Sequence, residues 1–234
     1  MYGLSGKSRG QPLSPDAEVG RDRPIAIDTP VGVAEVFVEP ANSKARAWLV
    51  LGHGAGGDVD APDLVAVTAA VVALDVWVAR VRQPYRVLGR RSPAPAAQLD
   101  AAWSAAVLAL RDRRFGGRSR SGRSPSPLFV GGRSSGARVA CRTALEVGAS
   151  GVVALAFPLH PPGHPEKTRV AELEAGVPLL VVQGARDTFG TPAEFPRGVR
   201  VRPVPGAGHG LGGAELPSAA TDVAGWILQQ LDST

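Results

Sequence analysis

Cysteine and long apolar runs are both scarce in this chain of 234 residues. The single Cys141 excludes an internal disulfide, and its place among small residues favours a buried thiol over a reactive one. The longest apolar run, residues 64–74, is interrupted by Thr68 and falls short of the roughly 20 residues that span a bilayer. No apolar leader segment follows Met1. We therefore expect a cytoplasmic protein that does not associate with membranes.

Motifs for nucleotides and nucleic acids are also missing. The glycines at 54–57 precede no Lys-Ser/Thr pair and form no GxGxxG register, so a phosphate-binding loop is not expected. A net charge of +5 and a pI near 10.1 would suit nucleic-acid binding. However, the arginine-rich run at 111–123 contains one aromatic residue, Phe115, and matches no nucleic-acid module. We interpret the run as a solvated basic loop. We expect no nucleic-acid partner, metal or cofactor. In the alternative, the protein associates with nucleic acid through these arginines and binds DNA or RNA in a strongly salt-dependent way.

Composition and length suit one globular domain. Apolar residues make up 44% and charged residues 20% of the chain, which is ordinary for a folded protein. Residues 1–23 are rich in Gly, Ser, Pro and charge without periodicity, so we expect a disordered tail. Residues 24–234 are expected to form a single domain without internal repeats.

The apolar pattern predicts an α/β architecture. Two β-branched runs between residues 25 and 39 flank a turn at 29–32 and suggest an antiparallel pair at a sheet edge. The later strands lack polar alternation and are separated by helix-length segments, which indicates a mostly parallel sheet with helices on both faces. We expect strands at 47–51, 76–81, 128–130, 151–157, 177–182 and 199–204, helices at 62–74, 99–110, 135–144, 167–175 and 220–231, and a loop at 83–93.

The stretch around Ser134 has the pattern of a nucleophile elbow. Gly132-x-Ser134-x-Gly136 follows an apolar strand and opens a helix, and such a turn exposes the serine Oγ above the sheet. Both glycines suit a crowded turn that leaves no room for a side chain. After the turn, Gly136, Ala140 and Ala144 recur every fourth residue and predict a helix face that packs close to the sheet.

The same five-residue pattern occurs at Gly6-Lys7-Ser8-Arg9-Gly10, where it serves as an internal control. Ser8 lies in the polar tail, with no strand before it and no apolar periodicity after it. The pattern alone is therefore weak evidence, and its context makes Ser134 the candidate nucleophile.

A serine nucleophile needs a base, and the chain has only four histidines. His53 stands before a glycine-rich loop, while His160 and His164 lie in a proline-rich loop before any plausible acid. His209 lies in a glycine-rich loop after the last predicted strand. We therefore expect His209 to take the proton from Ser134.

Asp187 is the expected acid that orients this base. It follows an apolar strand and stands between Ser134 and His209, which gives the chain order Ser, Asp, His that is typical of α/β-hydrolases. Alone, Asp187 could be a turn residue and His209 a surface histidine, but their combination with Ser134 favours a triad. Glu166 is the fallback acid.

An acyl-transfer site also needs an oxyanion hole built from backbone N–H donors. One donor is expected from Ser135, directly after the nucleophile, and the other from the glycine-rich loop after the strand at 47–51. Ala55 is the first choice in that loop, with Gly54 or Gly56 next.

Taken in order, these motifs resemble those of the α/β-hydrolase superfamily, and within it the compact dienelactone-hydrolase-like group. The likeness runs from about residue 25 to the C-terminus. It is carried by HGAGG at 53–57, PY at 84–85 with GRR at 89–91, GGRSSG at 131–136, PLHPPG at 158–163, GARD at 184–187 and GHG at 208–210. The resemblance implies an α/β-hydrolase fold and assigns the nucleophile, acid, base and oxyanion loop to the residues named above.

These inferences predict a serine hydrolase that cleaves a small or medium acyl ester or thioester through an acyl-enzyme. No insertion between consecutive strands is large enough for a separate lid domain, so the site should be open. The alternative is a catalytically idle hydrolase fold that serves as a protein interaction module, with a distorted or blocked triad. The acyl group, the leaving group and the oligomeric state stay open. Residues expected to contact substrate, each of which could instead be packing or rim, are Gly54, Gly56, Tyr85, Arg133, His160 and Phe189.

Overall fold

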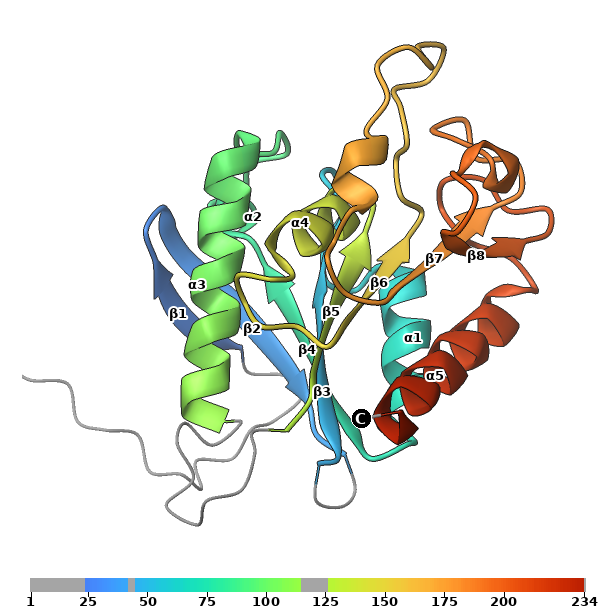
Figure 1. Ribbon diagram of the computed structural model, residues 1–234. Helices are drawn as coiled ribbons and strands as arrows, with labels where there is room; N and C mark the ends of the chain where they lie inside the picture. Colours follow the sequence, from blue (N-terminus) through green and yellow to red (C-terminus); the bar gives the residue numbers. More distant parts are fainter. Residues whose placement is uncertain (1–23, 42–44, 115–125, 234) are drawn as a thin grey trace, which may run out of the picture.

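The computed structural model describes residues 24–41, 45–114 and 126–233, and the central feature of this part is one eight-stranded sheet (Figure 1). The predicted tail at 1–23 and most of the arginine-rich run lie outside the described residues. The strands are β1 Ile25–Thr29, β2 Gly32–Glu39, β3 Ala47–Gly52, β4 Val76–Arg82, β5 Leu128–Arg133, β6 Gly151–Leu155, β7 Leu179–Gly184 and β8 Arg200–Val204.

The sheet is mostly parallel, as the sequence predicts. The strand order is β1-β2-β4-β3-β5-β6-β7-β8. The β1–β2 and β2–β4 pairs are antiparallel, and every other neighbouring pair is parallel. The carboxyl ends of β3, β5, β6, β7 and β8 therefore meet at one edge, where α/β sheets place their ligands.

Helices cover both faces of the sheet (Figure 1). Alternate residues of β3 divide between two apolar clusters: Trp48 and Val50 pack toward α3 and α4, while Leu49 and Leu51 pack toward α1 and α5. This alternation follows from the pleat, which turns successive side chains to opposite faces. The helices are α1 Pro62–Val72, α2 Pro84–Val87, α3 Ala96–Arg114, α4 Ser135–Thr143 and α5 Leu216–Asp232, with 3₁₀ turns η1 Val170–Leu173 and η2 Pro192–Glu194.

The structure corrects several predicted boundaries. The expected loop at 83–93 begins with the short helix α2, which Pro84 starts and Gly89, at φ +72°, follows. The predicted helix at 167–175 is only the 3₁₀ turn η1. The strand β6 ends at Leu155 rather than at residue 157, because Ala156 takes φ +47° and turns the chain out of the sheet.

No lid domain interrupts the described part of the fold. The connection from β6 to β7 contains only the turn η1, and the other described connections at this edge are short loops, α2 or η2. None of the helices within the described ranges is long and apolar enough to cross a membrane.

Candidate active site

Ser134 stands at the sharp turn between β5 and α4, in a strained backbone conformation. Its φ is +53° and its ψ is −109°, a region that non-glycine residues enter only when the surrounding structure holds them there. The Ser134 N–H donates to the carbonyl of Leu155 at 2.9 Å, which ties the turn to β6. The elbow geometry that the sequence pattern predicts is therefore present.

The flanking glycines are explained by close packing against β3. A Cβ on Gly132 or on Gly136 would overlap the carbonyl oxygen of Gly52. Helix α4 thus begins directly against the end of β3, and Ala140 and Ala144, both fully buried, continue the same small face.

The Ser134, His209 and Asp187 side chains form a continuous hydrogen-bonded series. His209 Nε2 lies 2.9 Å from Ser134 Oγ, and His209 Nδ1 lies 2.9 Å from Asp187 Oδ2. Asp187 follows β7 and is 1% exposed, whereas the His209 side chain, in the loop after β8, is 23% exposed. The His209 ring is therefore partly open to solvent, while the Asp187 carboxylate is buried.

Two further donors fix the Asp187 carboxylate. The Phe189 N–H donates to Oδ1 at 2.8 Å, and Gln183 Nε2 donates to Oδ2 at 2.9 Å. Gln183 was not among the residues predicted from the sequence. The one feature of the sequence that could have indicated it is the polar side chain of Gln183 in the otherwise apolar strand Leu179–Gly184.

Phe189 packs on the base. Its ring centroid lies 4.2 Å from that of His209, with an interplanar angle of 30°. The residue is half-buried, so one ring face covers the imidazole and part of the side chain borders the site. The structure thus places Phe189 against the triad, while its predicted contact with substrate stays a prediction.

The glycine-rich loop after β3 is held by two side chains that contact its carbonyl groups. His53 Nδ1 lies 2.8 Å from the Gly54 oxygen, and the Tyr85 hydroxyl donates to the Ala55 oxygen at 2.9 Å. The N–H of a trans peptide points opposite to its carbonyl, so the amides of Ala55 and Gly56 are turned away from these anchors. The predicted role of these amides as oxyanion donors stays a prediction.

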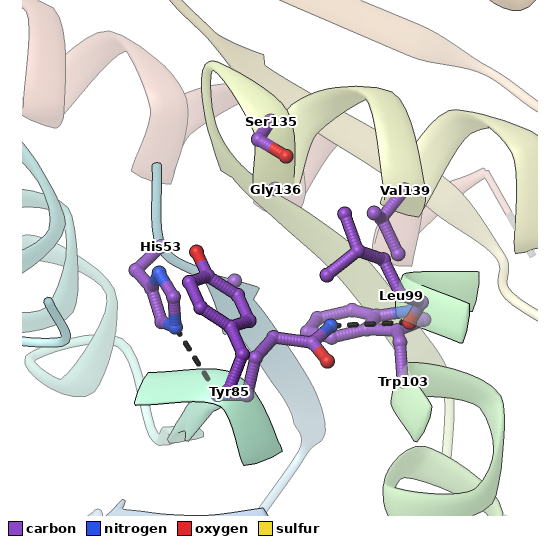
Figure 2. A pocket seen from close by; sticks show the side chains of 9 residues that line it. His53, Tyr85, Leu99, Trp103, Ser135, Gly136 and Val139 are labelled. Carbon is purple, nitrogen blue, oxygen red and sulfur yellow. Dashed lines mark hydrogen bonds between the residues drawn. The ribbon is translucent and has the colours of Figure 1, made fainter. Parts of the chain in front are cut away.

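His53 is a neutral structural histidine. Its Nε2 accepts a hydrogen bond from the Gln83 N–H at 3.1 Å, so Nδ1 carries the proton that it donates to Gly54 (Figure 2). Burial lowers the pKa of the imidazole, which keeps this tautomer uncharged. His53 therefore links the glycine-rich loop after β3 to the chain that follows β4.

Arg133 links three segments that border the site. Its Nε forms an ion pair of 2.8 Å with the buried carboxylate of Asp63, next to the first residue of α1. Its Nη2 donates to the carbonyl oxygen of His209 at 3.3 Å, and its Nη1 packs over Gly54. Burial raises the pKa of Asp63, and the arginine offsets that effect. Arg133 points across the site from the elbow to the base loop.

His160 has both ring nitrogens engaged within the protein. Nδ1 lies 2.9 Å from the Pro161 carbonyl oxygen and Nε2 lies 2.9 Å from Glu194 Oε2. These two acceptors, the backbone carbonyl first and then the carboxylate, raise the pKa of His160. The backbone N–H of His160 also donates to the Phe189 carbonyl at 3.1 Å, so this loop is fastened to the loop after Asp187.

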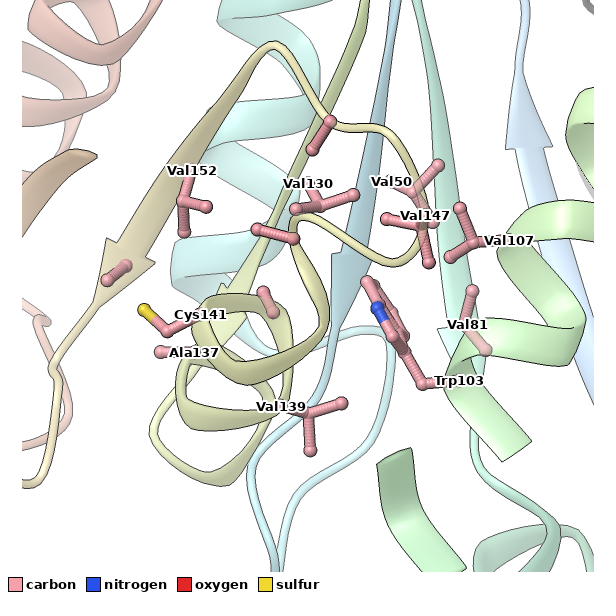
Figure 3. Close-up of a cluster of buried hydrophobic side chains, with 14 of the residues drawn as sticks. Val50, Val81, Trp103, Val107, Val130, Ala137, Val139, Cys141, Val147 and Val152 are labelled. Atoms are coloured by element: carbon pink, nitrogen blue, oxygen red, sulfur yellow. The ribbon is translucent and has the colours of Figure 1, made fainter. Parts of the chain in front are cut away.

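The remaining candidates lie outside the triad. Glu166 pairs with the exposed His164 at 3.1 Å, which leaves Asp187 as the acid on the base. Cys141 is buried in the same apolar cluster as Ala137 and Val152 (Figure 3), and burial raises the pKa of its thiol to about 12. No group of three or more metal-ligating side chains occurs within residues 24–41, 45–114 and 126–233.

A small pocket adjoins the elbow on the side of α3 and α4 (Figure 2). Only about 10 Å³ of it is open to the centre of a water molecule, which is room for about one water. Its wall combines side chains of the Gln83–Tyr85 segment with apolar groups of the two helices. The lining residues are Gly52, His53, Gln83, Tyr85, Leu99, Trp103, Ser135, Gly136 and Val139.

Comparison with known proteins places this geometry in context. Residues 45–214 match the model of a family described as alpha/beta hydrolase domain. No curated protein matches the sequence. Among solved structures, the chain is similar to an α/β serine hydrolase without a lid from Xanthomonas campestris, with 18% identity, a TM-score of 0.67 and coverage of 95% of this chain and 97% of that one.

Two other solved structures share the fold. An α/β serine hydrolase homologue from Coxiella burnetii is 15% identical, with a TM-score of 0.68 and coverage of 92% of this chain and 100% of that one. Est1E from Butyrivibrio proteoclasticus is also 15% identical, with a TM-score of 0.69 and coverage of 90% of this chain and 100% of that one.

Proposed function

Because the chain belongs to the alpha/beta hydrolase domain family, we propose that it is a serine hydrolase that cleaves a small or medium acyl ester or thioester through an acyl-enzyme. The observation that carries this proposal is the series of two 2.9 Å contacts from Ser134 Oγ through His209 to Asp187. A nucleophile, a base and an acid in this sequence of contacts are the parts that acyl transfer requires.

Acylation begins when Ser134 Oγ attacks the substrate carbonyl carbon and His209 Nε2 takes the hydroxyl proton. The imidazolium that forms is stabilised by the Asp187 carboxylate, which stays ionised. His209 then gives its proton to the leaving alcohol or thiol, and the bond to the leaving group breaks. Ser134 is left as an ester of the acyl group.

The negative charge on the substrate oxygen needs donors that are already in place. We assign this role to the amides of Ser135 and Ala55, with Gly54 or Gly56 as the alternatives in the loop. The anchors at His53 and Tyr85 support Ala55 and Gly56 alike, because they hold the Gly54 and Ala55 carbonyls and turn the Ala55 and Gly56 amides the other way. Preorganised donors of this kind act without a reorganisation cost during the reaction.

Deacylation uses the same groups in reverse. A water molecule next to His209 gives up a proton to Nε2 and attacks the acyl carbon. His209 then returns the proton to Ser134 Oγ, which releases the carboxylic acid and restores the enzyme. The 23% exposure of the His209 side chain leaves room for that water.

The shape of the site favours short substrates. No lid covers the described site edge, and the pocket beside the elbow has room for about one water. Long acyl chains would find little apolar surface to bury. We propose that four side chains border the acyl or leaving group: Tyr85, Phe189, Arg133 and His160. The parts of these side chains that make no hydrogen bond within the protein would contact the substrate.

A fluorophosphonate probe tests the proposal, because it reacts with a serine hydroxyl that a neighbouring base activates as a nucleophile. Wild-type protein should be labelled, and Ser134→Ala should not. Circular dichroism would confirm that both are folded. If folded wild-type protein resists labelling, the proposal is wrong and the alternative is favoured, a catalytically idle fold that binds a partner protein. The contact between Ser134 and His209 argues against that alternative, because an idle fold is expected to have a distorted or blocked triad.

A further inference from the structure

Gln183 is buried in the sheet directly below the triad. It lies next to the last residue of β7, and its side chain is 0% exposed. The preceding strand residues Leu180, Val181 and Val182 are apolar, as expected inside a parallel sheet. A neutral amide in such a place needs partners for its N–H groups and its oxygen.

The Gln183 amide nitrogen has three acceptors around it. Nε2 lies 2.7 Å from the Gly190 oxygen, 2.9 Å from Asp187 Oδ2 and 3.3 Å from the Phe157 oxygen. The two shorter contacts use the two N–H bonds, and the third is the weakest. Gln183 thus joins the exit of β6, the acid itself and the loop after the acid.

These acceptors fix the orientation of the amide. If the group were rotated by half a turn, Oε1 would face two carbonyls and a carboxylate, which all repel it. In the observed orientation, Oε1 has no hydrogen-bond partner within the described chain. A buried acceptor without a partner is costly, so this residue is not explained by stability of the strand alone.

We propose that Gln183 is a positioning residue of the reaction, which holds Asp187 Oδ2 in line with His209 Nδ1. This inference rests on the proposed serine hydrolase function. The Phe189 amide fixes Oδ1 and Gln183 fixes Oδ2, so the carboxylate cannot turn about its terminal torsion. Without Gln183, one side of Oδ2 loses its donor and the carboxylate is free to tilt away from the imidazole.

The test compares Gln183→Met with wild type and with a matched control. Methionine has a similar length and keeps the core filled but donates no hydrogen bond. Thr68→Val is the control, because Thr68 is also buried and donates to the Leu64 carbonyl, on α1. Gln183→Asn is the second variant, since its amide is too short to reach Oδ2; it carries the test if the methionine variant does not fold.

The readouts are the rate of fluorophosphonate labelling, the hydrolysis of a short-chain nitrophenyl ester, and the downfield proton signal of the His209 Nδ1–H. In the Gln183 variants, kcat should fall roughly 10- to 100-fold with KM changed little, by analogy with the outer-shell groups that orient metal ligands. The proton signal should shift or broaden. Thr68→Val should change none of these values by more than about twofold.

The two hypotheses fail in different ways. If wild-type protein is neither labelled nor active, the proposed function is wrong. If wild type reacts and a folded Gln183 variant reacts at the same rate with an unchanged proton signal, the function stands and the positioning role is wrong. A lower thermal midpoint at full kcat would also contradict the proposal, because it would show that Gln183 only stabilises the fold.

Discussion

The Tyr85 hydroxyl lies 2.9 Å from the carbonyl oxygen of Ala55, although 30 residues separate them in the sequence. The tyrosine is 6% exposed and comes from α2, while Ala55 lies in the loop after β3. Burial raises the pKa of the hydroxyl to about 12, so it remains a donor throughout the working pH range. One contact thus couples the chain after β4 to the proposed oxyanion donor.

Tyr85→Phe should therefore weaken stabilisation of the oxyanion, while the phenylalanine ring still fills the position of the tyrosine ring. Loss of one oxyanion donor costs on the order of 10²- to 10³-fold in kcat, and loss of a residue that only holds the donor should cost about 10-fold. Steady-state hydrolysis of a short-chain ester measures the effect. Ser104→Ala is a suitable control, since it removes a buried hydroxyl that contacts Glu146 away from the site. An unchanged kcat in Tyr85→Phe would show that the loop holds its shape by itself.

Triad substitutions should produce unequal losses. We expect Ser134→Ala to lower kcat on the order of 10⁶-fold, as in subtilisin, because the nucleophile is absent. Asp187→Asn should lower it about 10⁴-fold, since an amide favours the wrong tautomer of His209. Glu166→Gln should leave kcat unchanged, because Glu166 pairs with His164 and not with the base. A large loss in the glutamine variant would reassign the acid.

Two glycine-to-alanine substitutions should change stability in opposite directions. A Cβ at Gly136 would overlap the Gly52 carbonyl, so Gly136→Ala should lower the free energy of unfolding by about 1–3 kcal/mol. Gly225 lies within α5 with open space around it, so Gly225→Ala should raise the same free energy by about 0.5–1 kcal/mol. Urea denaturation measures both. Equal effects at the two positions would mean that the close approach of α4 to β3 is not rigid.

The protonation of His160 should make stability depend on pH. Its folded-state pKa is raised by the Pro161 carbonyl and by Glu194, with opposing contributions from burial and then from Arg169. The stabilisation is therefore fully present below the unfolded-state pKa of about 6.5, and it is lost as the pH rises through the raised folded-state value. The urea midpoint should fall over this window in wild type.

Glu194→Gln should flatten that pH dependence, because it removes the carboxylate that favours the charged ring. His164→Gln is the matched control, since this second histidine of the same loop is exposed and should leave the slope as it is. The Pro161 carbonyl should keep part of the slope in Glu194→Gln, so only a slope that this variant leaves undiminished would assign the titration to another group.

Much of the architecture could be predicted from the sequence, because the patterns that indicate apolar strands and glycine-containing turns lie within short segments of the chain. The edge pair at β1 and β2, the parallel strands and the elbow at Ser134 follow from patterns within ten or so residues. The family match and the mostly parallel eight-stranded sheet confirm the predicted α/β-hydrolase fold. The short helix α2 was missed, because four residues give no periodicity to read.

The contacts that shape the site could not be predicted in the same way. The partners of Arg133 are Asp63 and the His209 carbonyl, which are far from it in the sequence and meet it only at the edge of the folded sheet. His160 was expected near substrate, but its bond to Glu194 depends on where the 3₁₀ turn η2 lies. Such pairings are set by the packing of whole strands, and a single sequence does not encode them in any short pattern.

The close contact between Gly184 and the base loop limits how this molecule can be altered. A Cβ on Gly184 would overlap the Gly208 carbonyl, so any larger residue at the end of β7 would push the His209 loop away from the acid. Attempts to broaden substrate range by random mutagenesis would lose most variants at this position and at Gly132 and Gly136. Diversity is better introduced at Leu99 and Val139, whose side chains line the pocket beside the elbow.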